Sequence, residues 1–288
     1  MASRSTLRRH DALYFDDGNI VMSATSANNP GSVVFRVHKS VMAKHSPVFA
    51  DMFSLPDTGT AAETYDGAPL ICMPDAAEDL QKLLEALYCQ PPFSLVPLSP
   101  HNPSIARPVL ALSTKYEITH LRQLIVDRLE ADWPLTLEKW DALEDMTMSQ
   151  RSHHYRFPGP FIDDLFPEPA SAIRLAHDFD IPTILPAAFY HLLRIPVADD
   201  WNLLHKDSPK ATAEALWTGR RTAKWDLLRA EDLLTVLRGR DALLRALNAK
   251  MFSISLEPEH PEDEERCDKF EGYSALIDIV KGYFEPTT

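Results

Sequence analysis

The feature that most constrains the fold is one continuous stretch, residues 33–53, with the sequence VVFRVHKSVMAKHSPVFADMF. Val33, Phe35 and Val37 alternate with other side chains, which is the period of a strand that buries one face. The apolar spacing then becomes helical with almost no connection, so the strand must lead straight into a helix. Ser46-Pro47 begins a second short helix, because proline is tolerated in the first turn of a helix and disrupts its interior.

This strand–helix–helix unit resembles the centre of the BTB/POZ domain. Members of that family have a hydrophobic strand followed by His-Lys or His-Arg, an apolar pair, Ser-Pro, Phe and Met-Phe. The chain supplies these residues in order and spacing with His38-Lys39, Val41-Met42, Ser46-Pro47-Val48-Phe49 and Met52-Phe53. Together with the opening segment YFDDGNIV, it resembles the BTB domains that are abundant in mushroom-forming fungi. The resemblance implies an α+β fold, in which helices flank a short three-stranded sheet.

The strands expected around this unit fit that plan. Residues 19–22 form the first, and the turn-rich segment SATSANNPGS makes it an antiparallel hairpin with the strand at Val33. The third covers residues 69–73 and is ended by Pro74. Asp75 is then the expected N-cap of an amphipathic helix over residues 76–90.

The BTB/POZ domain is expected at residues 13–133, after a polar, basic tail at residues 1–12. Its last two helices are expected around the phrase ALSTKYEITHLRQLIVDRL, which starts at residue 111. Residues 90–108 are too rich in proline for a helix or a central strand, so they are expected to be an insertion in the domain. Two interpretations stay open: an irregular surface loop, or a strap that presents Phe93, Leu95 and Val96 to a partner.

Residues 134–288 are expected to form an all-helical C-terminal domain. The segment RLAHDFDIPTILPAAFYHL repeats the apolar positions of the earlier phrase 63 residues later, which predicts two matched helical hairpins. A helix break is expected at Gly239. Helices are expected over residues 137–148, 211–217, 225–238, 241–251 and 273–284, with polar loops at 149–161 and 257–268.

Charge and composition limit the partners. The formal net charge of −13 disfavours a nucleic acid, because phosphate binding depends on clustered Lys and Arg. The most basic stretch, residues 220–250, interleaves Asp and Glu at helical distances, which is typical of a salt-bridged helix face. No apolar run predicts a membrane span or a signal peptide. The cysteines, Cys72, Cys89 and Cys267, are too few and scattered for a disulfide framework, so an intracellular protein of the cytoplasm or nucleus is expected.

Catalytic and metal-binding motifs are missing from the sequence, and neither a cofactor nor a small-molecule substrate is expected. The chain has no GxSxG, no phosphate-binding glycine loop and no HExxH. His153-His154 is the densest histidine pair, but no carboxylate or thiol stands at ligand spacing beside it. The alternative that stays open is an enzyme in the helical half that uses His153, His154 or His177 with a carboxylate.

What the resemblance implies is protein binding rather than chemistry. Family members self-associate, recruit a cullin-type ubiquitin-ligase scaffold, or recruit transcriptional co-regulators. The hypothesis is a non-enzymatic adaptor or scaffold. Its two candidate roles are a substrate adaptor of a cullin-type ubiquitin ligase and, alternatively, a scaffold for transcriptional co-regulators. In dimeric members a charged pair at positions similar to Asp17 and Lys39 lines a shallow pocket. The candidate contact residues are Asp17, Lys39, Val41, Met42, His45, Phe49, Met52, Phe53, Phe93 and Leu95.

Two family features that would name the partner are absent. Domain-swapped dimers have an amphipathic helix ahead of the first strand, and MASRSTLRRHDAL lacks an apolar stripe. Cullin-binding members usually carry a hydrophobic-x-Glu step after the helix that is expected to end near Tyr88, and residues 89–95 contain no Glu. Both observations weaken these roles, although the helical repeats loosely resemble the extension that supports cullin binding in other BTB proteins.

Overall fold

The computed structural model describes residues 7–28, 30–55, 63–88, 95–156, 162–205, 216 and 220–254, with the backbone alone for 151–156 and 250–254. The chain divides into two compact units. The first contains Met1–Leu95 and Ser104–Asp127, and the second contains Val96–Pro103 and Arg128–Thr288. Four expected elements lie wholly or largely outside the described residues: the segment around Phe93, the helix at 211–217, the loop at 257–268 and the helix at 273–284.

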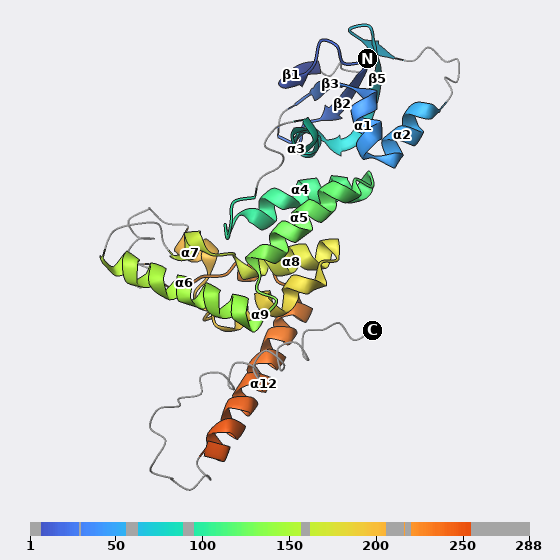
Figure 1. Ribbon diagram of the computed structural model, residues 1–288. Helices are drawn as coiled ribbons and strands as arrows, with labels where there is room; N and C mark the ends of the chain where they lie inside the picture. The colour runs from blue at the N-terminus through green and yellow to red at the C-terminus, as the bar shows by residue number, and fades with distance from the viewer. Residues whose placement is uncertain are drawn as a thin grey trace. The chain divides into compact units, whose positions relative to one another are not determined.

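The first unit is built on a five-stranded sheet in the order β1-β3-β2-β5-β4 (Figure 1). β2 and β3 form the expected antiparallel hairpin, whereas β1 runs parallel to β3 and β5 runs parallel to β2. Val34, Phe35 and Val37 of β3 are fully buried, as are Val21 and Met22 of β2. The strands are β1 (Leu7–Tyr14), β2 (Ile20–Thr25), β3 (Ser32–Val37), β4 (Thr64–Tyr65) and β5 (Ala68–Ala76).

The prediction of a tail at residues 1–12 is wrong from Leu7 onward, and the predicted three strands are five. β1 has only one buried side chain, Leu13, so its sequence lacks the alternation that marks a strand. Its backbone pairs with β3 instead, and Arg9 forms an ion pair with Asp66 and lies over the Tyr14 ring. Edge strands held by backbone pairing and polar contacts carry little periodicity.

Helices follow the sheet strands much as the sequence indicates. α1 (Lys39–His45) and α2 (Pro47–Ser54) come directly after β3, and α3 (Ala77–Tyr88) follows β5. β5 nevertheless continues through Pro74, because the register between β2 and β5 shifts at this point and the proline sits in the irregularity. Asp75 is therefore not a helix N-cap: its carboxylate accepts hydrogen bonds from Lys115 and from the Tyr116 hydroxyl.

The proline-rich segment is shorter than predicted, because α4 (Asn102–Lys115) covers its last residues. Pro103 lies in the first helical turn, where it is tolerated. Pro108 lies in the interior, where the buried side chains Ala106, Val109 and Leu110 outweigh its missing hydrogen bond. Residues 96–103 belong to the second unit.

The two predicted helical hairpins are confirmed and end their first helices in the same way. The hairpins are α4 with α5 (Thr119–Asp132), and α8 (Pro169–Phe179) with the 3-10 turn η1 (Pro182–Ile184) and α9 (Leu185–Leu193). Glu117 and Asp180 both have φ of 52°. In each hairpin, the amide of the next residue donates a hydrogen bond to the carbonyl five residues earlier. Ile118 donates to Ser113 over 2.7 Å, and Ile181 donates to Ala176 over 2.9 Å. This is the hydrogen bond of a Schellman helix end.

The rest of the second unit is helical in the part that the structure describes. α6 (Leu137–Arg156) is longer than predicted and runs into the expected loop at 149–161. The other elements are α7 (Ile162–Leu165), α10 (Trp201–Leu204), the 3-10 turn η2 (Trp225–Leu227) and α12 (Ala230–Ile254). The predicted break at Gly239 is also wrong, because α12 passes through it without interruption. A helical glycine costs about 1 kcal/mol, which the packing of the buried neighbours Val236 and Ala242 offsets.

Candidate protein-interaction surface

The step from α1 to α2 is fixed by Ser46. Its hydroxyl accepts a hydrogen bond from the Phe49 amide over 3.1 Å and donates one to the Tyr116 carbonyl over 2.6 Å. Ser46 is buried, so neither bond is shared with bulk water. The Ser-Pro step therefore caps α2 and ties it to the turn that precedes α5.

His38, at the junction of β3 and α1, has a structural role. Its backbone amide donates to the Tyr88 hydroxyl over 2.9 Å, and its Nε2 lies 3.1 Å from Asp17 Oδ1. The Tyr88 ring stacks in turn on Phe15, with centroids 5.0 Å apart. Burial raises the pKa of Tyr88, which keeps the hydroxyl protonated at neutral pH.

Asp17 and Lys39, suggested above as a charged pair, each have a different partner. Asp17 pairs with His38, and its side chain is 84% exposed. Lys39 donates its backbone amide to Asn19, while its ammonium group lies 5.7 Å from the centre of the Phe53 ring. The nearer partner of Lys39 is thus an aromatic ring, in a cation–π arrangement.

The predicted contact residues divide between core and surface. Met42 and Phe49 are fully buried, and Leu95 is nearly so, which corrects their assignment to a contact surface. Met42 and Phe49 are the buried residues of α1 and α2. Phe93 lies outside the described residues. The partly exposed candidates on the helical pair are Lys39, Val41, His45, Met52 and Phe53.

His45 forms a ring pair with His120 at the start of α5, with centroids 4.8 Å apart. Burial lowers the pKa of His45, and the charges of His120 and Lys44 lower it further. The lowered pKa favours the neutral form of His45. The ring pair joins α1 to α5.

Leu55, directly after α2, is a surface residue that the sequence reasoning missed. Its side chain is 72% exposed, the largest value among the large hydrophobic residues that the structure describes. Beside the partly exposed Met52 and Phe53, it extends the apolar end of α2. The sequence could have predicted this exposure, because an apolar residue beyond the end of an amphipathic helix does not belong to the buried face of that helix.

A comparison with models of protein families matches residues 27–132 to the BTB/POZ domain. The chain carries a BTB/POZ domain. The match begins in the loop before β3, includes the Ser46 junction and ends at the last residue of α5. A comparison with curated proteins gave no match.

The BTB/POZ domain is a module of protein–protein interaction, so a contact surface is the site to expect in the first unit. The expected α+β domain followed by a helical region is confirmed. Among the described residues, no helix is long and apolar enough to cross a membrane. Within the same part of the chain, no group of three or more His, Cys, Asp and Glu could hold a metal ion.

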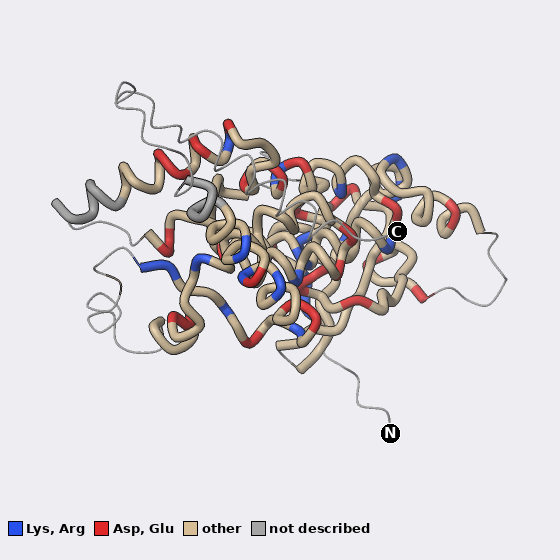
Figure 2. Tube along the Cα trace, turned by 90° about the horizontal axis from the view of Figure 1, so that it is seen from below, with Lys and Arg blue, Asp and Glu red and all other residues tan. Residues whose placement is uncertain are grey.

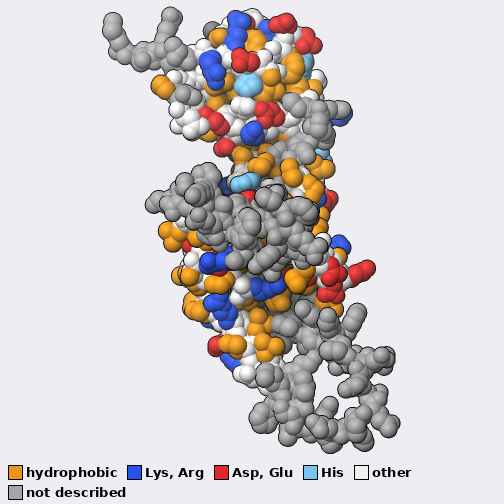
Figure 3. All heavy atoms as spheres, turned by 90° about the vertical axis from the view of Figure 1, so that its left-hand side faces the viewer, with side chains coloured by type: hydrophobic (Ala, Val, Ile, Leu, Met, Phe, Trp, Pro, Cys, Tyr) orange, Lys and Arg blue, Asp and Glu red, His pale blue; other side chains and the backbone are white. Residues whose placement is uncertain are grey.

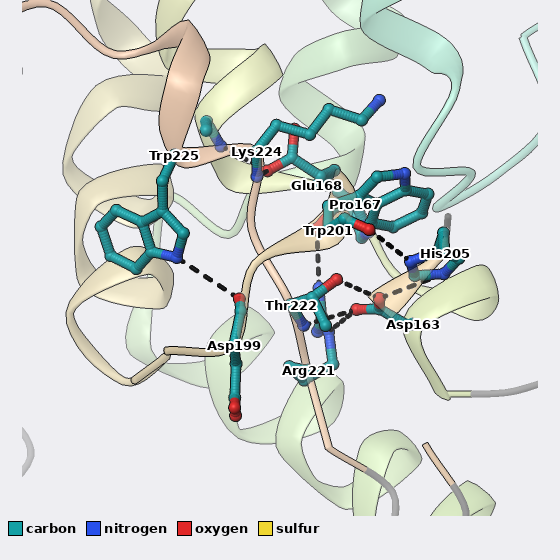
Figure 4. A network of polar contacts seen from close by, with 11 residues as sticks. Asp163, Pro167, Glu168, Asp199, Trp201, His205, Arg221, Thr222, Lys224 and Trp225 are labelled. Carbon is teal, nitrogen blue, oxygen red and sulfur yellow. Dashed lines mark hydrogen bonds and ion pairs between the residues drawn. The ribbon is translucent and has the colours of Figure 1, made fainter. Parts of the chain in front are cut away.

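The second unit contains a buried polar network around Asp163 (Figure 4). The Asp163 carboxylate accepts hydrogen bonds from the Thr222 amide, over 2.8 Å, and from the Thr222 hydroxyl. His205 Nε2 lies 3.6 Å from the same carboxylate, and the His205 ring stacks on Trp201 with centroids 4.0 Å apart. Burial raises the pKa of Asp163, while the bonds from Thr222 and the charges of Arg221 and His205 oppose the rise.

Glu168 and Asp199 hold the rest of this segment. Glu168, also buried, caps α8 by accepting from the Ala170 and Ser171 amides and accepts a third bond from the Lys224 amide over 3.0 Å. The Asp199 carbonyl accepts from Trp225 Nε1 over 3.3 Å (Figure 4). Thr222 is fully buried, so its hydroxyl is out of reach of a substrate. The network anchors residues 220–225 immediately before α12.

His177, the enzyme candidate with a described side chain, belongs to an ion-pair cluster. Its Nε2 lies 3.1 Å from Asp232 Oδ1, and Arg174 lies 3.2 Å from the other oxygen. Asp232 also accepts the Arg229 amide over 2.9 Å, at the start of α12. A carboxylate with these partners joins α8 to α12. The side chains of His153 and His154 lie outside the described residues.

The basic stretch before and within α12 is largely paired, as its sequence indicates. Arg220 pairs with Asp199, Arg229 with Asp178, and Arg245 with Asp241. Figure 2 shows Lys and Arg interspersed with Asp and Glu along the chain. On the face shown in Figure 3, basic side chains form small groups separated by hydrophobic ones. This distribution favours salt-bridged helix faces over a phosphate-binding surface.

Proposed function

We propose that the protein is a non-enzymatic adaptor whose BTB/POZ domain binds the scaffold of a cullin-type ubiquitin ligase and whose helical unit binds a client protein. The observation that carries the proposal is the pair of helical hairpins. The second hairpin repeats the turn of the first, with Glu117 and Asp180 in the same left-handed conformation. A repeated hairpin after a BTB/POZ domain resembles the helical extension that supports cullin binding in this family.

The proposed scaffold-binding surface is the apolar end of α2. Met52, Phe53 and Leu55 supply hydrophobic contact, and Lys39 over the Phe53 ring supplies a positive charge at its border. Hydrophobic centres with polar borders are typical of protein interfaces. The missing hydrophobic-x-Glu step implies that this surface, rather than residues 89–95, supplies most of the affinity.

A binding experiment with matched variants tests the role. The purified chain is immobilised and exposed to the N-terminal region of a cullin, and binding is compared for wild type, Leu55→Glu and Leu124→Glu. Leu124 is the control, because it is 48% exposed on α5 in the same unit and lies outside the proposed surface. We expect Leu55→Glu to weaken binding at least about tenfold, as burial of a charge at a contact does, and Leu124→Glu to bind like wild type.

Two results would reject the cullin role. One is a wild-type chain that does not bind cullin, and the other is equal binding by all three proteins. The first result leaves the alternative of a co-regulator scaffold, which capture of a transcriptional co-repressor through the same Leu55-dependent surface would support. Either role places the protein inside the cell, in the cytoplasm or the nucleus.

A further inference from the structure

α12 carries an exposed stripe of leucines beside its own packing face. Leu233, Leu237, Leu244 and Leu247 form this leucine stripe, and they are between 40% and 59% exposed. Val236 and Ala242 are buried, and α12 packs against α9. Figure 1 shows the C-terminal half of α12 extending beyond α8 and α9 of the same unit.

The leucine stripe has the spacing of a helix-pairing seam. Its members stand at intervals of four, seven and three residues, and Arg240 occupies the position that would divide the interval of seven. Alternating intervals of four and three are the a and d positions of a heptad pattern. Arg240 is turned toward the unit itself, because its guanidinium donates to the Ile195 carbonyl over 3.1 Å.

The base of α12 is held firmly, which makes the stripe a fixed surface. Arg174 and His177 of α8 both contact Asp232 in the first turn, and the anchored segment 220–225 precedes the helix. A helix that is fixed at its start presents its side chains in a defined direction. It therefore loses less conformational freedom when a second helix binds.

A matching sequence follows α12 in the same chain. Residues 273–284, YSALIDIVKGYF, place Tyr273, Leu276, Val280 and Tyr283 at intervals of three, four and three, with Ile277 and Phe284 beside them. This segment lies outside the described residues, and the pattern is a property of its sequence. The leucine stripe has the same intervals of three and four residues, so apolar side chains recur at the same spacing in both segments.

The connecting residues favour a return of the chain onto α12. Residues 255–272 can extend over roughly 60 Å at about 3.3 Å per residue, whereas α12 from Leu233 to Ile254 rises only about 32 Å. They include the acidic run EDEE at residues 262–265, and α12 carries the exposed Arg238 and Arg245. A tethered segment also has a high effective concentration.

We propose that the leucine stripe of α12 is the docking surface for residues 273–284 of the same chain, which pack on it as an antiparallel helix. A second copy of the chain is the less favoured occupant, because the tethered segment has the higher effective concentration. The inference does not depend on cullin binding.

Hydrogen–deuterium exchange of the full chain tests the proposal. The amides of residues 241–249 are compared in wild type, in the variant Ile277→Glu/Val280→Glu, and in the control Val197→Glu, which alters a residue 60% exposed elsewhere in the second unit. We expect the double variant to exchange at least about tenfold faster in this part of α12, as loss of a packed helix allows. The control should exchange like wild type. Unchanged tryptophan fluorescence shows that the unit remains folded in each variant.

A reciprocal variant and a mass measurement complete the test. Leu237→Glu/Leu244→Glu should increase exchange of residues 273–284, since the same contact is broken from the other side. Equal exchange in the wild type and both double variants would overturn the proposal. So would protection of α12 that rises with protein concentration together with a doubled mass in light scattering, because the occupant would then be a second copy.

Discussion

Replacing Ser46 with alanine removes two buried hydrogen bonds at the centre of the BTB/POZ domain. Loss of the cap of α2 costs about 1 kcal/mol. The Tyr116 carbonyl, which accepts the Ser46 hydroxyl over 2.6 Å in a buried setting, is left without that donor, at a cost of about 1–3 kcal/mol. The expected loss is therefore about 2–4 kcal/mol, a large share of the ~5–15 kcal/mol that stabilises a domain.

The five tryptophans make it possible to separate the two units in this experiment. All of them lie at residue 133 or later, in the second unit, so tryptophan fluorescence does not report on the first. Hydrogen exchange of residues 33–53 in increasing urea reports on the BTB/POZ domain. With a slope of about 1–2 kcal/mol per molar urea, Ser46→Ala should lower the midpoint of these residues by roughly 1–4 M.

Ser54→Ala is the matched control, because Ser54 lies at the end of the same helix and its hydroxyl donates to the Asp51 carbonyl in an exposed position. It should change stability by less than about 0.5 kcal/mol. If Ser46→Ala and Ser54→Ala had equal, small effects, the account of the Ser-Pro step as a buried anchor would be refuted. A large fall in the fluorescence midpoint of the second unit would equally contradict a local effect.

Three further predictions concern buried or paired groups. Burial and the charges of Arg221 and Arg194 hold the pKa of His191 well below its usual value, so its contribution to stability is present above about pH 6.5 and lost as pH falls. His191→Leu should reduce the pH dependence of urea unfolding, followed by tryptophan fluorescence. An unchanged pH dependence would contradict this account of His191. Hydrogen bonds from Ser26 and the Ala27 amide lower the pKa of Glu78 to about 2, so its contribution to stability is present above the ordinary pKa of 4.5 and lost between there and about 2. Glu78→Gln should flatten the stability of the first unit in this window, measured by hydrogen exchange of residues 33–53 in urea, whereas Glu63→Gln should not. Thr222→Val keeps the shape of a fully buried side chain but removes a hydrogen-bond donor to Asp163. The loss should lower the free energy of unfolding of the second unit by about 1–3 kcal/mol, measured by tryptophan fluorescence. An unchanged free energy of unfolding would show that the network does not anchor this segment.

The parts of the fold that the sequence predicted are those with strong local patterns. The strand–helix–helix unit at residues 33–53 combines a change of period with a Ser-Pro step, and both act within a few residues. β1 could not be predicted in this way, since its backbone pairing with β3 and the ion pair of Arg9 with Asp66 join distant parts of the chain. Asp75 failed for a related reason: a local N-cap competed with partners 40 and 41 residues away.

The contact surface was predicted only in part, because an apolar stripe gives the direction of a helix face and not the depth of each residue. Phe49 and Phe53 lie one turn apart on α2, yet the first is fully buried and the second is partly exposed. The difference comes from Tyr116, whose ring stacks on Phe49 at 4.5 Å between centroids. That neighbour comes from the turn after α4 and is invisible in the pattern of α2.

The repeated hairpin turn shows how one sequence echo can have two structural uses. Glu117 and Asp180 hold equivalent left-handed positions, although glycine is the residue that tolerates this conformation best. In the first hairpin, the residue before the turn is Tyr116, whose carbonyl accepts Ser46 and whose ring covers Phe49. The equivalent residue of the second hairpin is Phe179, which keeps an aromatic ring but has no hydroxyl with which to bind a carboxylate as Tyr116 binds Asp75. The turn itself is therefore a local device that either unit can use, and its neighbours make the first copy part of the BTB/POZ domain.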